Sequence, residues 1–228
     1  LDLTNGVLTA TYSDNTTEDI NMKDAAVTIK TGSPADVNNP NVKLEYKGQE
    51  TTFNITVNDP IQSLSVATPM TQGEYDHGDT LNFAGLTLAA VTKSGATTTI
   101  TSTTPGLTIS ETQADVNSPN FTKTSGSSDV EVKGTQVIKF TYDGKTAQQT
   151  IIVNDRISSV NIVTQPNKTA IKYGEALDLT GATVKITLAS GDTTNISLPD
   201  GSATISSFNN TQVGSKQNLT VTINNKTA

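Results

Sequence analysis

His77 is the single histidine of the chain, and most catalytic chemistry would depend on it. A Ser-His-Asp arrangement needs a histidine base beside a nucleophile, and histidine-based metal sites usually need further ligands. The chain has no cysteine, which excludes thiolate nucleophiles and thiolate metal sites. Because no trio of nucleophile, base and orienting group can be assembled, we expect a protein that is not an enzyme, without catalytic, cofactor or metal sites. His77 then has a structural or surface role.

A second group of residues that could perform chemistry is the acidic cluster Asp14, Glu18 and Asp19. Converging carboxylates could bind calcium or act as a catalytic pair, but the corresponding positions of two further repeats in this chain carry no recurring acid. Paired-carboxylate glycosidases also need a cleft with sugar-stacking rings, and aromatic residues make up only 4% of this chain. These residues are therefore expected to form a solvated hairpin turn.

Asp59 and Asp155 both follow an asparagine and both stand between repeats. Calcium could stiffen such junctions, but its coordination shell needs about six to eight oxygens. When the two junctions are aligned, they share only one acidic position. We favour a turn-forming role for these Asn-Asp pairs and keep junctional calcium as the alternative.

Three other motifs favour structural roles. The segments ADVNNPN from Ala35 and ADVNSPN from Ala114 have the composition of turns or short loops, with a ligand-binding role as the alternative. An amide cross-link between Lys and Asn would need a buried acid beside them, and no such trio recurs. Asn-X-Ser/Thr sequences are expected from the Asn- and Thr-rich composition alone; examples begin at Asn15, Asn54, Asn120 and Asn195.

The elements that carry these residues recur along the chain. Residues 1–20, 81–100 and 177–196 align without gaps, and residues 46–59 align with 142–155. The middle repeat carries an insertion near residues 121–133, expected to be an exposed loop or an extra hairpin. Its polar composition is more typical of a surface segment that the fold tolerates than of a segment that binds a ligand.

Within the repeats, apolar residues alternate with polar ones, as in half-buried strands. Leu8, Ala10 and Tyr12 show the alternation in the first repeat, and Val184, Ile186 and Leu188 show it in the third. Three aligned columns predict turns or bends with positive φ. They contain Asn15, Gly95 and Gly191; Asn5, Gly85 and Gly181; and Lys47-Gly48, Asp143-Gly144 and Asn224-Asn225.

These patterns predict an all-β protein of tandem immunoglobulin-like β-sandwich modules. Residues 1–59 form a module that lacks its first strand, residues 60–155 a complete module with the insertion, and residues 156–228 a module that lacks its last strand. Edges left unpaired in this way are expected to fray or to pair with another molecule by strand addition.

The net charge of -7 excludes the basic surface that nucleic-acid binding needs and disfavours anionic membranes. No apolar run approaches the length of about 20 residues that spans a bilayer, so we expect no membrane insertion in this segment.

One set of residues resembles a known family, the bacterial immunoglobulin-like domain, group 3 type, found in tandem in Gram-positive surface proteins. The resembling segments are Tyr173-Gly174-Glu175, Leu177 to Gly181, Gly191 to Thr194, Val213-Gly214 and Leu219 to Val221. The resemblance implies an extracellular spacer, stalk or adhesive array of a secreted or cell-wall-anchored bacterial protein. Its partner would be a host or cell-wall protein or a glycan.

The alternative is an accessory carbohydrate-binding or substrate-positioning array of a secreted glycan-active enzyme. Rows of surface aromatics would favour it, and the chain has no tryptophan and five tyrosines.

Overall fold

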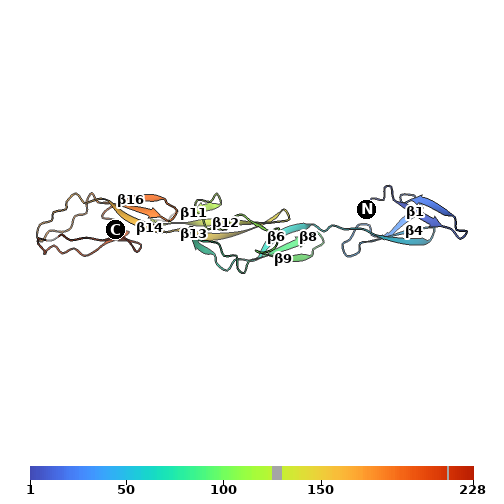
Figure 1. Cartoon of the computed structure of the whole chain (residues 1–228), viewed down its shortest axis with the longest axis horizontal. Helices are drawn as coiled ribbons and strands as arrows, with labels where there is room; N and C mark the ends of the chain where they lie inside the picture. Colours follow the sequence, from blue (N-terminus) through green and yellow to red (C-terminus); the bar gives the residue numbers. More distant parts are fainter. Residues whose placement is uncertain (125–129, 215) are drawn as a thin grey trace. The chain divides into compact units, whose positions relative to one another are not determined.

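The described part of the chain consists of strands joined by turns and loops (Figure 1). The computed structural model describes residues 1–124, 130–214 and 216–228. None of these residues lies in a helix, which confirms the predicted all-β class. Accordingly, the described residues contain no helix that could cross a membrane. The chain divides into two compact units: Leu1–Gln62 with Val91–Thr97, and Ser63–Ala90 with Thr98–Ala228. We call residues 1–59, 60–155 and 156–228 modules one, two and three.

Module one contains two small antiparallel sheets. One has the order β1-β2 and the other β3-β4-β5. The strands are β1 (Val7–Thr11), β2 (Thr17–Asn21), β3 (Val27–Thr31), β4 (Asn41–Tyr46) and β5 (Gln49–Asn54). Ile20, Val42 and Leu44 are buried between polar neighbours, as the alternation predicts for strands with one apolar face.

Module two has the same two-sheet plan with additional strands. Its sheets have the orders β6-β8-β9 and β10-β12-β13-β7, with β11 beside β12. The strands are β6 (Ile61–Thr68), β7 (Glu74–Asp76), β8 (Thr87–Thr92), β9 (Thr97–Thr101), β10 (Thr108–Ile109), β11 (Phe121–Lys123), β12 (Val132–Tyr142) and β13 (Lys145–Asp155). β12 and β13 pair antiparallel along all eleven residues, and β7 runs parallel to β13. The core includes the fully buried Leu88, Ile138 and Phe140.

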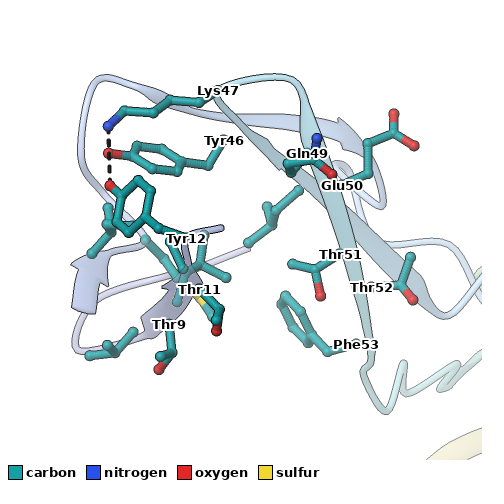
Figure 2. A pocket seen from close by; sticks show the side chains of 16 residues that line it. Thr9, Thr11, Tyr12, Tyr46, Lys47, Gln49, Glu50, Thr51, Thr52 and Phe53 are labelled. Atoms are coloured by element: carbon teal, nitrogen blue, oxygen red, sulfur yellow. Dashed lines mark hydrogen bonds between the residues drawn. The ribbon is translucent and has the colours of Figure 1, made fainter. Parts of the chain in front are cut away.

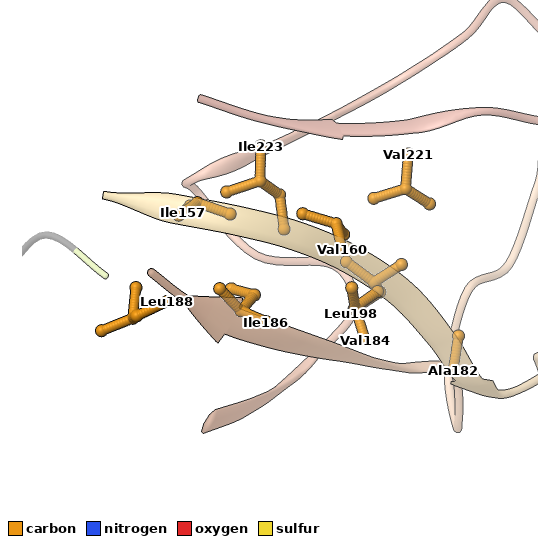
Figure 3. Packing of buried hydrophobic residues seen from close by; sticks show 9 residues of the cluster. All are labelled: Ile157, Val160, Ala182, Val184, Ile186, Leu188, Leu198, Val221 and Ile223. Carbon is orange, nitrogen blue, oxygen red and sulfur yellow. The ribbon is translucent and has the colours of Figure 1, made fainter. Parts of the chain in front are cut away.

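Module three has the sheet orders β14-β15-β16 and β17-β18-β19. Its strands are β14 (Ile157–Thr164), β15 (Thr183–Leu188), β16 (Thr193–Ser197), β17 (Ala203–Ile205), β18 (Val221–Ile223) and β19 (Lys226–Thr227). Ile157 and Val160 of β14 pack in one buried cluster with Ile186 of β15 and Ile223 of β18 (Figure 3). The core is therefore aliphatic, as the low aromatic content predicts.

The predicted turns take the conformations that their residue types favour. Lys47 and Gly48 have φ values of 48° and 78°, and Asp143 and Gly144 have values of 46° and 70°. Two consecutive positive φ angles belong to a type I′ turn, whose twist matches that of the flanking strands. This confirms the turn columns, and it explains why asparagine, aspartate and glycine recur in them; Lys47 takes the same conformation.

The insertion is only partly what the sequence predicted. Phe121 to Lys123 pair with Gln136 to Gly134, which confirms an additional hairpin arm, while residues 125–129 lie outside the described residues. Residues 130–132 are half-buried rather than exposed. Val130 and Val132 pack against the buried cluster of module three, so this end of the insertion contributes to a core.

Candidate functional site

The connection before module two is held by the carboxylate of Asp59. The backbone N–H of Ser94 donates to Asp59 Oδ1 at 2.9 Å, and its hydroxyl donates to Oδ2 at 2.6 Å. The N–H of Lys93 donates to the carbonyl oxygen of Pro60 at 3.0 Å. We call this set of bonds the Asp59 clamp. It ties the residues that precede β6 to the tip of the β8–β9 hairpin.

An equivalent clamp occurs at Asp155, with the same sequence spacing. The N–H of Ser190 donates to Asp155 Oδ1 at 2.9 Å, and the N–H of Ala189 donates to the carbonyl oxygen of Arg156 at 2.9 Å. The serine hydroxyl differs between the two clamps, because Ser190 Oγ accepts a bond from the N–H of Asp192 instead. Asp155 is fully buried, and its Oδ2 has no hydrogen-bond partner among the described residues.

Further bonds surround the Asp155 clamp. Arg156 is the single residue between β13 and β14, and its Nε donates to Asp76 Oδ1 at 2.7 Å. This contact raises the pKa of Arg156 above its ordinary value. The N–H of Ile157 donates to Glu131 Oε1 at 3.0 Å. With a one-residue connection and several bonds across it, this junction has few free backbone torsions.

The two junction aspartates thus act as hydrogen-bond acceptors for backbone N–H groups. Neither they nor the other described residues form a group of three or more His, Cys, Asp or Glu side chains suited to a metal ion. Sequence reasoning singled out both aspartates but missed their serine partners. The signal was present, since aspartate and serine recur with the same spacing of 35 residues in both repeats.

The replacement Ser94→Ala is expected to raise the pKa of Asp59. Bonds from Ser94 and Thr92 hold that pKa below its ordinary value of 3.8 by favouring the charged carboxylate. The stabilisation is therefore present above about pH 4 and is lost as the pH falls through the lowered pKa. A carboxyl-carbon NMR titration measures the shift. The matched variant Ser190→Ala, in the other clamp, should leave the pKa of Asp59 unchanged; an equal shift in both variants would contradict the assignment.

The remaining predicted residues are used locally. Asp14 accepts bonds from the N–H and hydroxyl of Thr16, at 3.0 and 2.6 Å, which closes the hairpin turn. Asp19 accepts from the Thr9 hydroxyl at 2.7 Å, and Glu18 accepts from the hydroxyl of Tyr12. Each carboxylate of this cluster binds a different neighbour, so the cluster does not converge on one point.

The structure brings His77 together with one of the two loop motifs. The N–H of Val116 donates to His77 Nδ1 at 3.3 Å, and Asp115 Oδ1 lies 3.4 Å from that nitrogen. Both partners belong to the ADVNSPN segment, whose Ala114 is fully buried. His77 therefore anchors this loop in module two. The first motif forms a bridge of its own between Asp36 and Asn39.

Sequence reasoning missed one group of polar side chains. Lys133 Nζ and Asn154 Nδ2 both donate to Glu74 Oε1, at 3.0 and 2.8 Å. These bonds lower the pKa of Glu74, with Asn154 as the larger cause. Amide formation between Lys and Asn needs an uncharged amine, which burial favours, whereas the side chains of Lys133 and Glu74 are each 51% exposed. The group is best explained as an ion pair that joins β12, β13 and β7.

Module one has an open groove between its two sheets. It has a volume of about 690 Å³ and is lined by residues of β1 and β5 together with Tyr46 and Lys47. Figure 2 shows Thr11 and Tyr12 on one side and Thr51 and Phe53 on the other. Lys47 donates to the hydroxyl of Tyr12 at 3.3 Å at the end of the groove. A groove of this size in a module of 59 residues means that part of its core is unfilled.

The repeated pairs of mainly antiparallel sheets, with largely aliphatic cores, define a tandem array of immunoglobulin-like modules. Residues 164–228, which form most of module three, match the family model of the bacterial Ig-like domain (group 3). This confirms, for that module, the resemblance to the bacterial Ig-like domain of group 3. No curated protein matches the chain significantly.

Among solved structures, one match is described as the surface layer protein SbsC, domains 4–9. It has 13% sequence identity and a TM-score of 0.23, and the alignment covers 96% of this chain and 40% of that protein. The chain thus spans less than half of the matched structure. A TM-score this low supports no conclusion about this chain.

Proposed function

We propose that this chain is a spacer segment of a bacterial surface protein, in which folded modules hold other parts of the protein at a distance. The match of module three to the bacterial Ig-like domain supports the class. The same match supports an extracellular location, which is part of the proposal. Attachment to a cell wall is a further part of the proposal.

The observation that carries the proposal is the junction at Asp155. A spacer must resist bending, and bending between two domains occurs mainly in the residues that connect them. Here the connection is Arg156 alone, and it bonds to Ala189 and Asp76. The adjoining Asp155 accepts a further bond from Ser190. Val130 and Val132 add apolar contact with the core of module three. The junction is therefore built as part of the fold rather than as a flexible linker.

An adhesive or carbohydrate-binding role would need a surface built for a ligand. Tyr12 and Tyr46 both lie near Lys47, whose Nζ is 5.6 and 4.9 Å from their ring centroids. These rings interact with the cation of their own module, and no row of exposed aromatic side chains accompanies them among the described residues. The spacer is therefore the function that the geometry supports best, and it involves no catalysis.

Stiffness across the junction gives a direct test. Spin labels attached to Gln148→Cys on β13 and Asn195→Cys on β16 would report one distance, since the chain has no native cysteine. We expect a narrow distance distribution by pulsed electron paramagnetic resonance. Asp155→Ala, which removes the acceptor of the Ser190 N–H, should broaden it clearly. The Ser190 N–H is partly buried, and a buried N–H left without a partner costs about 1–3 kcal/mol, so losing its acceptor should weaken the clamp.

Asp59→Ala is the matched control because it opens the other clamp, and it should leave this distribution narrow. A broad distribution in the unmodified junction would contradict the spacer proposal. Equal broadening by both substitutions would instead indicate a general loss of stability.

A further inference from the structure

The groove of module one lies where the other modules place their first strand. In module three, β14 pairs with β15, and Ile157 and Val160 of β14 enter the buried cluster. β1 aligns with β15, but the sheet of module one contains only β1 and β2. One edge of β1 is therefore without a strand partner among the described residues.

The inward-facing side chains of β1 are more exposed than the aligned side chains of β15. Val184, Ile186 and Leu188 of module three are 0%, 0% and 6% exposed. The corresponding residues of module one are Leu8, Ala10 and Tyr12; the first two are only half-buried, and Tyr12 is 38% exposed. The inward face of β1 has the sequence of a core strand but lacks the packing of one.

A second open edge lies on the other sheet. In module two, β7 runs parallel to β13 and pairs with Ile152, Val153 and Asn154. The aligned residues of module one are 56–58, and they belong to no strand. Val153 is fully buried, whereas its counterpart Val57 is only half-buried. Both edges that border the groove thus lack the strands that β6 and β7 provide in module two.

The hydrogen-bond register makes the edge of β1 competent for pairing. The N–H of Tyr12 donates to Thr16, and the N–H of Met22 donates to Gly6, so even-numbered residues of β1 bond to β2. In an antiparallel pair the alternate residues point their backbone groups the other way. Thr9 and Thr11 therefore present N–H and C=O groups to the open edge, as the aligned Lys185 and Thr187 do toward β14.

We propose that this groove binds an extended peptide strand from outside residues 1–228, with the apolar spacing of β6 and β7. Its first half would add antiparallel to β1, and its second half would lie parallel to residues 56–58. Leu64, Met70 and Tyr75 are the buried side chains of that segment in module two, so residues of this kind would fill the groove. Backbone pairing gives the affinity in such strand addition, and the alternate side chains give the specificity.

The test uses the full chain and a synthetic peptide with the sequence of residues 61–76. Amide hydrogen exchange, read by NMR, should slow by about tenfold or more at Thr9 and Thr11 when the peptide is added, since these amides become hydrogen-bonded. The amide of Ala10, already bonded to β2, should change less. The proposal is wrong if Thr9 and Thr11 do not slow, or if a scrambled peptide slows them equally.

Thr9→Pro provides the matched variant. Proline is tolerated at an edge position whose N–H faces away from the sheet, so β1 should stay paired with β2 while peptide binding is lost. Unchanged NMR shifts in β4 and β5 would show that module one is still folded. Retained binding by this variant would overturn the proposal. So would protection of Thr9 and Thr11 that grows with protein concentration alone, because a second copy of the chain would then be the occupant.

Discussion

The replacement Phe140→Ala is expected to lower the free energy of unfolding of module two by about 3–5 kcal/mol, as for other buried aromatic side chains. Phe140 is fully buried on β12 and makes an edge-to-face contact with Phe83, with ring centroids 6.4 Å apart. Hydrogen exchange measured by mass spectrometry on peptides from β12 and β13 would follow the change.

Exchange in those peptides should accelerate about a hundredfold or more, since each 1.4 kcal/mol corresponds to a factor of ten. Peptides from β4 and β5 should be unaffected, because module one has its own core around Val42 and Leu44. Tyr173→Ala serves as the control, since that side chain is 71% exposed. Acceleration in β4 and β5 of equal size would show that the modules unfold together.

Gly134→Ala is the second substitution with a large expected effect. An added Cβ would lie 2.4 Å from the carbonyl oxygen of Thr122 and 2.3 Å from the ring of Phe121. The ring can turn away, but the carbonyl belongs to β11 and is fixed by its pairing with β12. We expect a loss of about 1–3 kcal/mol or more from overpacking, with β11 displaced from β12. Chemical denaturation gives the loss, and exchange at Phe121 to Lys123 gives its location.

Gly73→Ala is the matched control. No atom lies within 4 Å of the Cβ that it would add, so it should be neutral or slightly stabilising. The double variant Gly134→Ala with Phe121→Ala separates the two contacts. If removing the ring restored stability, the clash with the backbone of Thr122 would not be the cause.

The features that sequence predicted well are those fixed by local chemistry. Asn224 and Asn225, for example, both have positive φ, as their alignment with Asp143-Gly144 predicts. Asparagine, aspartate and glycine tolerate that conformation better than other residues, so the turn is visible in the sequence. The alternation of Val184, Ile186 and Leu188 likewise identified an inward face that is buried in the structure.

The features that sequence reasoning missed depend on contacts between distant segments. Glu74 meets Lys133 and Asn154 because β7 pairs with β13, and parallel pairing between strands so far apart leaves no local pattern. The same holds for Val130 and Val132. Their place within an insertion suggested a surface position, whereas both side chains pack against the core of module three.

The parallel pairing of β7 with β13 has a mechanical consequence. Module two begins with β6, which leads within a few residues into β7, and it ends with β13. Tension that reaches β7 through β6 would therefore pull β7 and β13 in opposite directions along their axes. The hydrogen bonds between them would be loaded in shear, all at once, rather than broken one after another. Among the described residues, module one has no strand parallel to residues 56–58 and lacks this resistance. Under a stretching force we therefore expect module one to extend first and module two to carry the load.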